Sequence, residues 1–120
     1  LAATLKDDVL VFPVSMAGAL AVNYTAELEV PFNCIVTKVS GVVIEKLGDI
    51  DAGTVEMKND SGTSMTSGLL SFIICAPQAT LVSVTPSTNN TFAAGESIKM
   101  TVDKNTPGGL INMLIFVTRT

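Results

Sequence analysis

The sequence predicts an all-β fold: an antiparallel two-sheet β-sandwich, jelly-roll-like, with about eight strands. In several segments apolar and polar residues alternate with a period of two, as in strands that are buried on one side. Clusters of Gly, Pro, Asn and Ser separate these segments about every dozen residues, the spacing of a sandwich or barrel. Only residues 15–22 carry a pattern that could form a helical turn. An immunoglobulin-type sandwich would want a core Trp, which the chain lacks.

The expected strands follow one another along the whole chain. They are residues 8–14, 24–30, 32–46, 54–58, 69–76, 79–85, 97–103 and 110–117. Three of them, at 24–30, 54–58 and 97–103, alternate cleanly, and we expect each to bury only its apolar side. The long stretch 32–46 contains Gly41, where we expect a bend or a bulge.

Two expected strands, 69–76 and 110–117, are apolar on both sides. Only one side of a strand meets the core of a two-sheet sandwich. Because soluble monomers rarely expose a large contiguous apolar patch, we expect a neighbouring subunit to cover the outer side of both strands, in a cyclic homo-oligomer. The alternative is that a loop or the N-terminal segment covers it. The expected subunit-interface residues are Leu110, Asn112, Leu114, Phe116, Leu70 and Phe72.

The chain is expected to form one domain, because its 120 residues and 12.5 kDa suit a single core. Residues 1–22 are expected to be an N-terminal strand or arm, and residues 23–120 the β-sandwich. Charged residues make up only 15% of the chain, against about 25% in typical domains. We therefore expect a surface rich in Ser, Thr, Asn and Gly, part of which another chain covers.

The charge pattern and the apolar runs exclude two classes of partner. The net charge is −4, Arg119 is the single arginine and the lysines are scattered, whereas nucleic-acid binding needs clustered basic residues. No apolar run reaches the ~18 residues of a membrane helix. Asp7 and Asp8 stand where a signal peptide would need positive charge. We expect neither nucleic acid nor membrane as a partner.

The sequence carries no catalytic motif, and we do not expect an enzyme. It contains no histidine, which excludes Ser-His and Cys-His nucleophiles and most zinc or copper sites. In "GDIDAG", residues 48–53, Asp49 and Asp51 are spaced like cation ligands, but the third acid and the distal Glu of a calcium loop are missing. We interpret this segment as a solvated turn and expect no metal and no cofactor.

The two cysteines, Cys34 and Cys75, could form a disulfide, as a secreted protein would favour. We favour instead two small buried side chains. Carbohydrate recognition usually needs an aromatic platform, and the five Phe residues of this chain lie mostly among apolar neighbours and are expected in the core.

Four features of residues 31–120 carry a resemblance to a known kind of protein. They are a strand pair around the AGT turn in "PFNCIVTKVSGVVIEKLGDIDAGTVEMKN", the Gly-led apolar strand "GLLSFIICA", the approach "NNTFAAGESIKM" and the final strand "GGLINMLIFVTRT". In these features the chain resembles small bacteriophage virion proteins of the head-decoration, cement and head-fibre type. The resemblance implies a virion surface protein, commonly trimeric, that binds the capsid lattice. It does not extend to residues 1–22, for which an arm contacting capsid or neighbour is expected.

Two hypotheses of function follow. The first is a non-enzymatic structural virion protein that decorates and reinforces a viral capsid as a homotrimer. Its partners would be itself and the major capsid protein, and it would be assembled in the host cytoplasm onto the capsid surface. The alternative is a carbohydrate- or receptor-binding β-sandwich module of a fibre or an adhesin.

Overall fold

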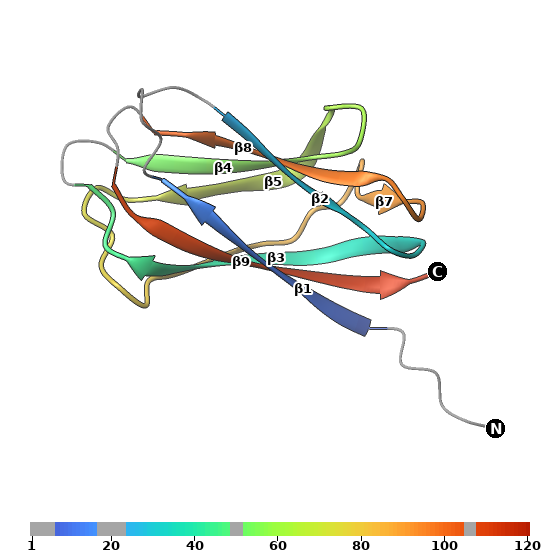
Figure 1. The fold of residues 1–120 in the computed structure, drawn as a ribbon, viewed down its shortest axis with the longest axis horizontal. Helices are drawn as coiled ribbons and strands as arrows, with labels where there is room; N and C mark the ends of the chain where they lie inside the picture. The colour runs from blue at the N-terminus through green and yellow to red at the C-terminus, as the bar shows by residue number, and fades with distance from the viewer. Residues whose placement is uncertain (1–6, 17–23, 49–51, 105–107) are drawn as a thin grey trace.

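The computed structural model describes residues 7–16, 24–48, 52–104 and 108–120, which contain nine strands and no helix (Figure 1). The strands are β1 (Asp7–Ser15), β2 (Tyr24–Glu29), β3 (Cys34–Glu45), β4 (Gly53–Lys58), β5 (Ser64–Phe72), β6 (Leu81–Val84), β7 (Thr91–Phe92), β8 (Ser97–Asp103) and β9 (Leu110–Arg119). Of the segment 1–22 that was expected to be a strand or arm, Asp7–Ser15 is a strand. Residues 17–23, which include most of the expected helical turn, lie outside the described part.

The strands pair as one long antiparallel hairpin that is rolled up on itself. β1 pairs with β9, β2 with β8, β3 with β6 and β4 with β5. β9 also pairs with β3, and β8 with β4, which joins these pairs into two sheets. The five-stranded sheet has the order β1-β9-β3-β6 with the short β7 beside β3, and the four-stranded sheet has the order β2-β8-β4-β5. This topology is a jelly roll, so the predicted fold class is confirmed.

The core lies between the two sheets, which form the two layers of Figure 1. All five methionines of the chain are buried in it, and Phe72 and Phe92 are its largest side chains. Methionine adapts its shape to irregular gaps, and such gaps arise where two twisted sheets face each other with few aromatic residues between them. The core is therefore filled mainly by flexible and β-branched side chains.

The register of β3 shows no bulge at Gly41, where a bend or a bulge was expected. It pairs in regular register with Met113 on one side and Val82 on the other. The register shifts of β3 against β9 occur between Val36 and Lys38 and again between Val43 and Glu45. A Cβ atom at Gly41 would lie 2.7 Å from the ring of Phe72. The glycine therefore makes room for the largest core side chain of the opposite sheet.

The two cysteines lie at opposite ends of the molecule. Cys34 is the first residue of the 12-residue β3 and is buried. Cys75 lies beside Gly48, beyond the other end of β3, and its backbone N–H donates to the Gly48 carbonyl at 3.4 Å. At about 3.3 Å per residue the two cysteines are roughly 40 Å apart. A disulfide needs Cα atoms within about 7 Å, so these two thiols cannot be bridged within one chain.

Candidate functional site

The five-stranded sheet presents apolar side chains on the side that faces away from the core. In β9, the even-numbered residues Leu110, Asn112, Leu114 and Phe116 are only partly buried, whereas the odd-numbered residues from 111 to 117 are fully buried. The strand therefore uses one apolar side for the core, and the described residues cover its other side only in part.

Edge strand β1 extends this apolar surface. Its outward residues Val9 and Val11 are 46% and 56% exposed, and they lie opposite Phe116 and Leu114 of β9. Pro13 lies opposite Asn112 in the same register. Directly opposed side chains on neighbouring strands are about 5 Å apart, so these residues form one continuous surface. We call it the apolar face, and it consists of Val9, Val11, Pro13, Leu110, Asn112, Leu114 and Phe116.

The size of the apolar face suits an interaction surface. Two strands about 4.8 Å apart and about 30 Å long, with side chains to either side, cover roughly 300 Å². Apolar patches of roughly 300–600 Å² on soluble proteins are often functional. The free edge of β1 is a poorer place for a partner strand, because Pro13 has no backbone N–H and Asp7 adds a charge at the start of the strand.

Polar contacts fix β1 on β9 at one end of the apolar face. Arg119 Nη2 lies 2.7 Å from Asp8 Oδ2, and Arg119 Nε donates to the same oxygen at 2.8 Å. The guanidinium carbon also lies 4.1 Å from the centre of the Phe32 ring. Thr118 Oγ1 donates to Asp7 Oδ1 at 2.8 Å. A shallow hollow of about 400 Å³ opens beside these contacts, with Asp7 and the residues around Val9 and Phe116 in its lining.

Polar side chains lie beside one half of the apolar face, toward the far edge of the same sheet. The Lys38 ammonium lies 5.4 Å from the centre of the Phe116 ring. Ser40, opposite Leu114, shares a hydrogen bond of 2.8 Å with Ser83 of β6. In the next row Val42 is apolar and partly buried, and it lies opposite both Asn112 of β9 and the exposed Leu81 of β6, so the apolar face continues to the far edge there.

A second apolar surface lies at the end of the sandwich where β3 leaves the sheet. The loop between β5 and β6 carries Ile73 and Ile74, which are 68% and 49% exposed. Hydrogen bonds tie this loop to the end of β3, among them Ala79 N to Val43 O at 2.8 Å. Ile44 of β3 and Leu81 of β6 are also exposed at this end, and we call the four residues Ile44, Ile73, Ile74 and Leu81 the isoleucine ridge.

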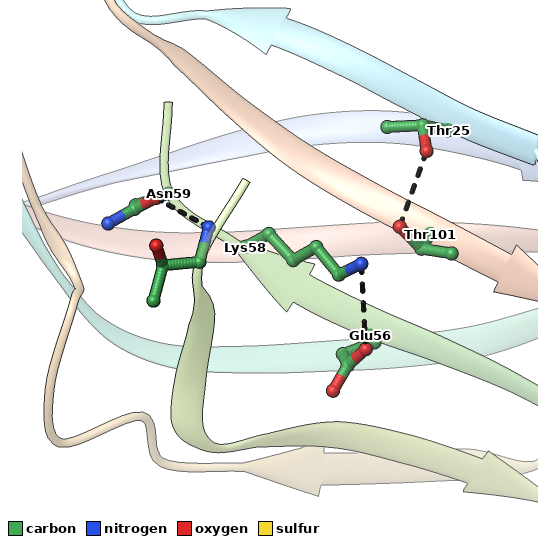
Figure 2. A network of polar contacts seen from close by, with 6 residues as sticks. Thr25, Glu56, Lys58, Asn59 and Thr101 are labelled. Carbon is green, nitrogen blue, oxygen red and sulfur yellow. Dashed lines mark hydrogen bonds and ion pairs between the residues drawn. The ribbon is translucent and has the colours of Figure 1, made fainter. Parts of the chain in front are cut away.

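The four-stranded sheet presents a different outer face, with hydroxyl and charged side chains. Figure 2 shows Thr25 and Thr101 with their hydroxyl oxygens 3.3 Å apart across β2 and β8, and Lys58 with its ammonium 3.8 Å from the Glu56 carboxylate. In the adjacent turn the Asn59 side-chain oxygen accepts hydrogen bonds from the backbone N–H groups of Ser61 and Thr63, and Figure 2 draws one of them. We call this surface, which carries Thr25, Glu56, Lys58 and Thr101, the polar face.

Two of the expected interface residues are not on the surface. Leu70 and Phe72 are 0% and 2% exposed and belong to the core, which corrects their assignment to an outer side. Their strand β5 ends at Phe72, because its pairing with β4 ends at Gly53. The side of β5 that faces away from the core carries Leu69 instead. A strand with two apolar sides does not reveal from its sequence which side is buried, and the choice made for this strand was wrong.

Residues of β1 and the ridge were missed as candidates. The signal for β1 was present, because residues 9–14, "VLVFPV", are as apolar on both sides as the closing strand. The ridge had no such signal, because Ile73 and Ile74 were expected inside a strand. The structure places Leu110, Asn112, Leu114 and Phe116 together on the outward side of β9.

The described residues offer little to catalysis or metal binding. They contain no cluster of three or more His, Cys, Asp or Glu side chains that could hold a metal ion, and Asp49 and Asp51 lie outside them. Burial raises the pKa of the Cys34 thiol and of the Tyr24 phenol, although for Tyr24 its hydrogen bond to the Ser15 carbonyl opposes the shift. Both groups therefore stay protonated at neutral pH. No helix in the described part has the length and apolar character of a membrane span.

No protein-family model matches the chain, and no curated protein sequence matches it either. Among solved structures, it is similar to a chain in the capsid asymmetric unit of cyanophage Pam1, with a TM-score of 0.57 and 12% identity over 100% of this chain and 91% of that one. The extra small virus particle of the prawn Macrobrachium rosenbergii gives a TM-score of 0.44 at 12% identity, over 92% of this chain and 77% of that one.

A further similar structure belongs to an enzyme. It comprises the CBM22-1 and GH10 modules of xylanase 10B from Clostridium thermocellum, with a TM-score of 0.42 and 12% identity over 96% of this chain and 26% of that one. At these identities the cyanophage likeness, which spans nearly the whole of both chains, shows a shared jelly-roll fold.

Proposed function

We propose that this chain is a non-enzymatic structural protein of a virus particle, which decorates and reinforces the capsid as a homotrimer. The observation that carries the proposal is the apolar face on the outward side of β1 and β9. A soluble jelly roll gains nothing from such a surface unless another protein covers it. The fold shared with a chain of the cyanophage Pam1 capsid, over all of this chain and 91% of that one, supports the particle as the place where this occurs.

The proposed role matches what the molecule offers. A protein that reinforces a lattice needs a stable fold and repeated contacts, and each contact can be weak because the number of sites multiplies it. The proposed partners are further copies of this chain and the major capsid protein, and the proposed location is the capsid surface after assembly in the host cytoplasm.

The carbohydrate-binding alternative has no comparable observation in its favour. Stacking on a sugar ring needs an exposed aromatic side chain. All aromatic residues of the chain, one Tyr and five Phe, are described by the structure, and none of them is in the exposed class. We therefore keep sugar binding only as an outcome of the experiment below.

The test is whether the purified chain binds to virus particles and whether this binding needs the apolar face through which its copies are proposed to associate. Particles from the source of the gene are purified on a density gradient, examined for this chain by mass spectrometry and then incubated with added protein. We expect cofractionation that Leu114→Asp or Phe116→Asp abolishes, while Thr101→Asp on the polar face leaves it intact. Absence of the chain from the particles, together with specific binding on a glycan array, would overturn the proposal in favour of the alternative.

A further inference from the structure

The strands along one side of the sandwich carry no charged side chain. Residues 61–95 contain no Asp, Glu, Lys or Arg, although charged residues make up 15% of the whole chain. At that average the segment would carry about five of them. The segment comprises β5, β6 and β7, and the bridge between Thr66 and Thr88 joins β5 to the chain that follows β6. The uncharged strands therefore lie together along one side of the molecule.

This side includes a sheet edge that lacks the usual protection against pairing with another strand. Proline, charged residues and cover by other parts of the chain all protect edge strands. Of the four edge strands in the described sheets, β1 has Pro13, β2 has Glu27 and Glu29, and β5 is partly covered through the bridge between Thr66 and Thr88. The fourth, β6, has no proline, no charge and a regular register with β3.

The open edge of β6 presents a defined set of backbone groups. Val43 N donates to Thr80 O at 2.9 Å, which sets the phase of the pairing between β3 and β6. In an antiparallel pair only alternate residues direct their backbone N–H and C=O groups to the partner strand. Val82 therefore directs its groups to β3, whereas Leu81 and Ser83 direct theirs to the open edge. The Leu81 side chain beside this edge is 60% exposed.

We propose that β6 pairs antiparallel with β6 of a second copy about a two-fold axis, with Ser83 opposite Ser83 of that copy. This register places Leu81 opposite Thr85 and Val82 opposite Val84 on both sides of the axis. The odd-numbered residues then exchange about six backbone hydrogen bonds. Registers shifted by two residues in either direction keep the same sides together but place fewer valines opposite one another.

The charge distribution favours a second copy of this chain as the partner. The net charge is −4, and the edge strands on the other side of the sandwich carry Asp7, Asp8, Glu27 and Glu29. Two copies therefore repel each other least when their uncharged sides meet. A two-fold axis brings the same patch of both copies together, so an uncharged side meets an uncharged side.

The contact is short, and its expected strength suits copies that are already held close together. A strand of four residues buries less area than a stable dimer needs, so we expect little of this dimer at low micromolar concentration. On a lattice, the high effective concentration of neighbouring copies would populate it. The inference goes beyond the proposed function, because the contact uses the backbone edge of β6 and not the outer side of the sheet, and it requires no particle.

The pairing is tested by disulfide trapping in a Cys75→Ser background, in which the remaining Cys34 is buried. Ser83→Cys places two thiols at the axis, where paired Cα atoms about 5.5 Å apart lie within the range that a disulfide spans. Thr25→Cys is the matched control, because it replaces an exposed hydroxyl residue on the edge strand β2. In a glutathione buffer we expect covalent dimers of Ser83→Cys to form at least about tenfold faster than those of Thr25→Cys, as measured on non-reducing gels.

A mixture of two further variants tests the register. Leu81→Cys and Thr85→Cys are expected to form a disulfide with each other and little with themselves, because only the two different positions face each other. Mass spectrometry distinguishes the products. The mixture keeps Ser83 and its hydrogen bond to Ser40, so it decides the test if circular dichroism shows that Ser83→Cys is not folded.

Two results would overturn the inference. One is a folded Ser83→Cys variant that forms dimers no faster than the Thr25→Cys control. The other is a Leu81→Cys variant that reacts with itself as fast as with Thr85→Cys, which would indicate collisions without a register. Because no particle is used, neither result bears on the proposed function, which the particle-binding experiment tests separately.

Discussion

The two sheets of the sandwich share one core but differ on their outer faces. In β8 the inward residues Met100 and Val102 are buried, and the outward residues Lys99 and Thr101 are polar. In β9 the inward residues are buried in the same way, yet the outward residues are mostly apolar. Folding alone requires only the inner side of each strand to be apolar. The core therefore does not require the additional apolar side on β1 and β9, and we propose that association with another molecule explains it.

The largest expected effect is a difference in the free energy of unfolding between substitutions on the two sides of strand β5. Leu70 of β5 is buried and Leu69, its neighbour, is half exposed. Leu70→Ala is expected to lower the free energy of unfolding by about 2–5 kcal/mol, because it leaves a cavity in the core. Leu69→Ala is expected to lower it by less than about 1 kcal/mol. Urea denaturation measures both, and equal losses would contradict the assignment of sides in the four-stranded sheet.

The next effect compares the two outer faces directly. Leu114→Asp places a charge at the centre of the apolar face, and Thr101→Asp places the same charge on the polar face. We expect the first to weaken self-association by about 100-fold and the second by less than about threefold, because only the first carboxylate would be buried without a partner. Concentration-dependent light scattering measures the difference. If both variants associated like the wild type, the apolar face would not be an interface.

A smaller effect on stability is expected from removing the ion pair beside the apolar face or the ion pair on the polar face. Arg119 is close to both Asp8 and the ring of Phe32, whereas Lys58 reaches only the Glu56 carboxylate at 3.8 Å among the contacts described. We expect Arg119→Ala to lower the free energy of unfolding by about 1 kcal/mol, since a part-exposed pair and a cation–π contact are each modest. Lys58→Ala should change it by less than about 0.5 kcal/mol. Thermal unfolding at low and high salt distinguishes them, and only the Arg119 effect should shrink measurably in salt.

The smallest expected effect is a loss of stability at alkaline pH, through the hydrogen bond that links β2 to β1. Burial raises the pKa of Tyr24, whose hydroxyl donates to the Ser15 carbonyl and links β2 to β1. The stability that this phenol contributes is complete below its unfolded pKa of about 10 and is lost as the pH rises through the raised folded value. We expect Tyr24→Phe to be less sensitive to alkaline pH than the wild type. An identical pH dependence of thermal unfolding in the two proteins would contradict this link.

Much of the fold could be predicted from the sequence, because burial leaves a clear pattern in half-buried strands. The clean alternation at residues 97–103 coincides with β8, and the strands at 24–30 and 54–58 correspond closely to β2 and β4. Where both sides of a strand are apolar, the pattern is ambiguous. The side of β5 that meets the core was assigned wrongly, because Leu69 and Leu70 are chemically equivalent and only the register with β4 distinguishes them.

Sequence patterns could predict only part of the candidate site. The outward side of β9 was identified as a candidate because its apolar excess is local in sequence. Its continuation onto β1 depends on the pairing of the first strand with the last, Val11 with Leu114, which no local pattern reveals. The exposure of Ile73 and Ile74 depends on where β5 ends, and the end of its pairing with β4 sets that position.

The central claim is that another copy of this chain covers the apolar face. It is tested most directly by the mass of the wild-type protein in solution. Sedimentation velocity at low micromolar concentration and physiological salt is expected to show a single closed species with a mass that is a multiple of 12.5 kDa. A well-behaved monomer of 12.5 kDa across the concentration range would contradict the claim.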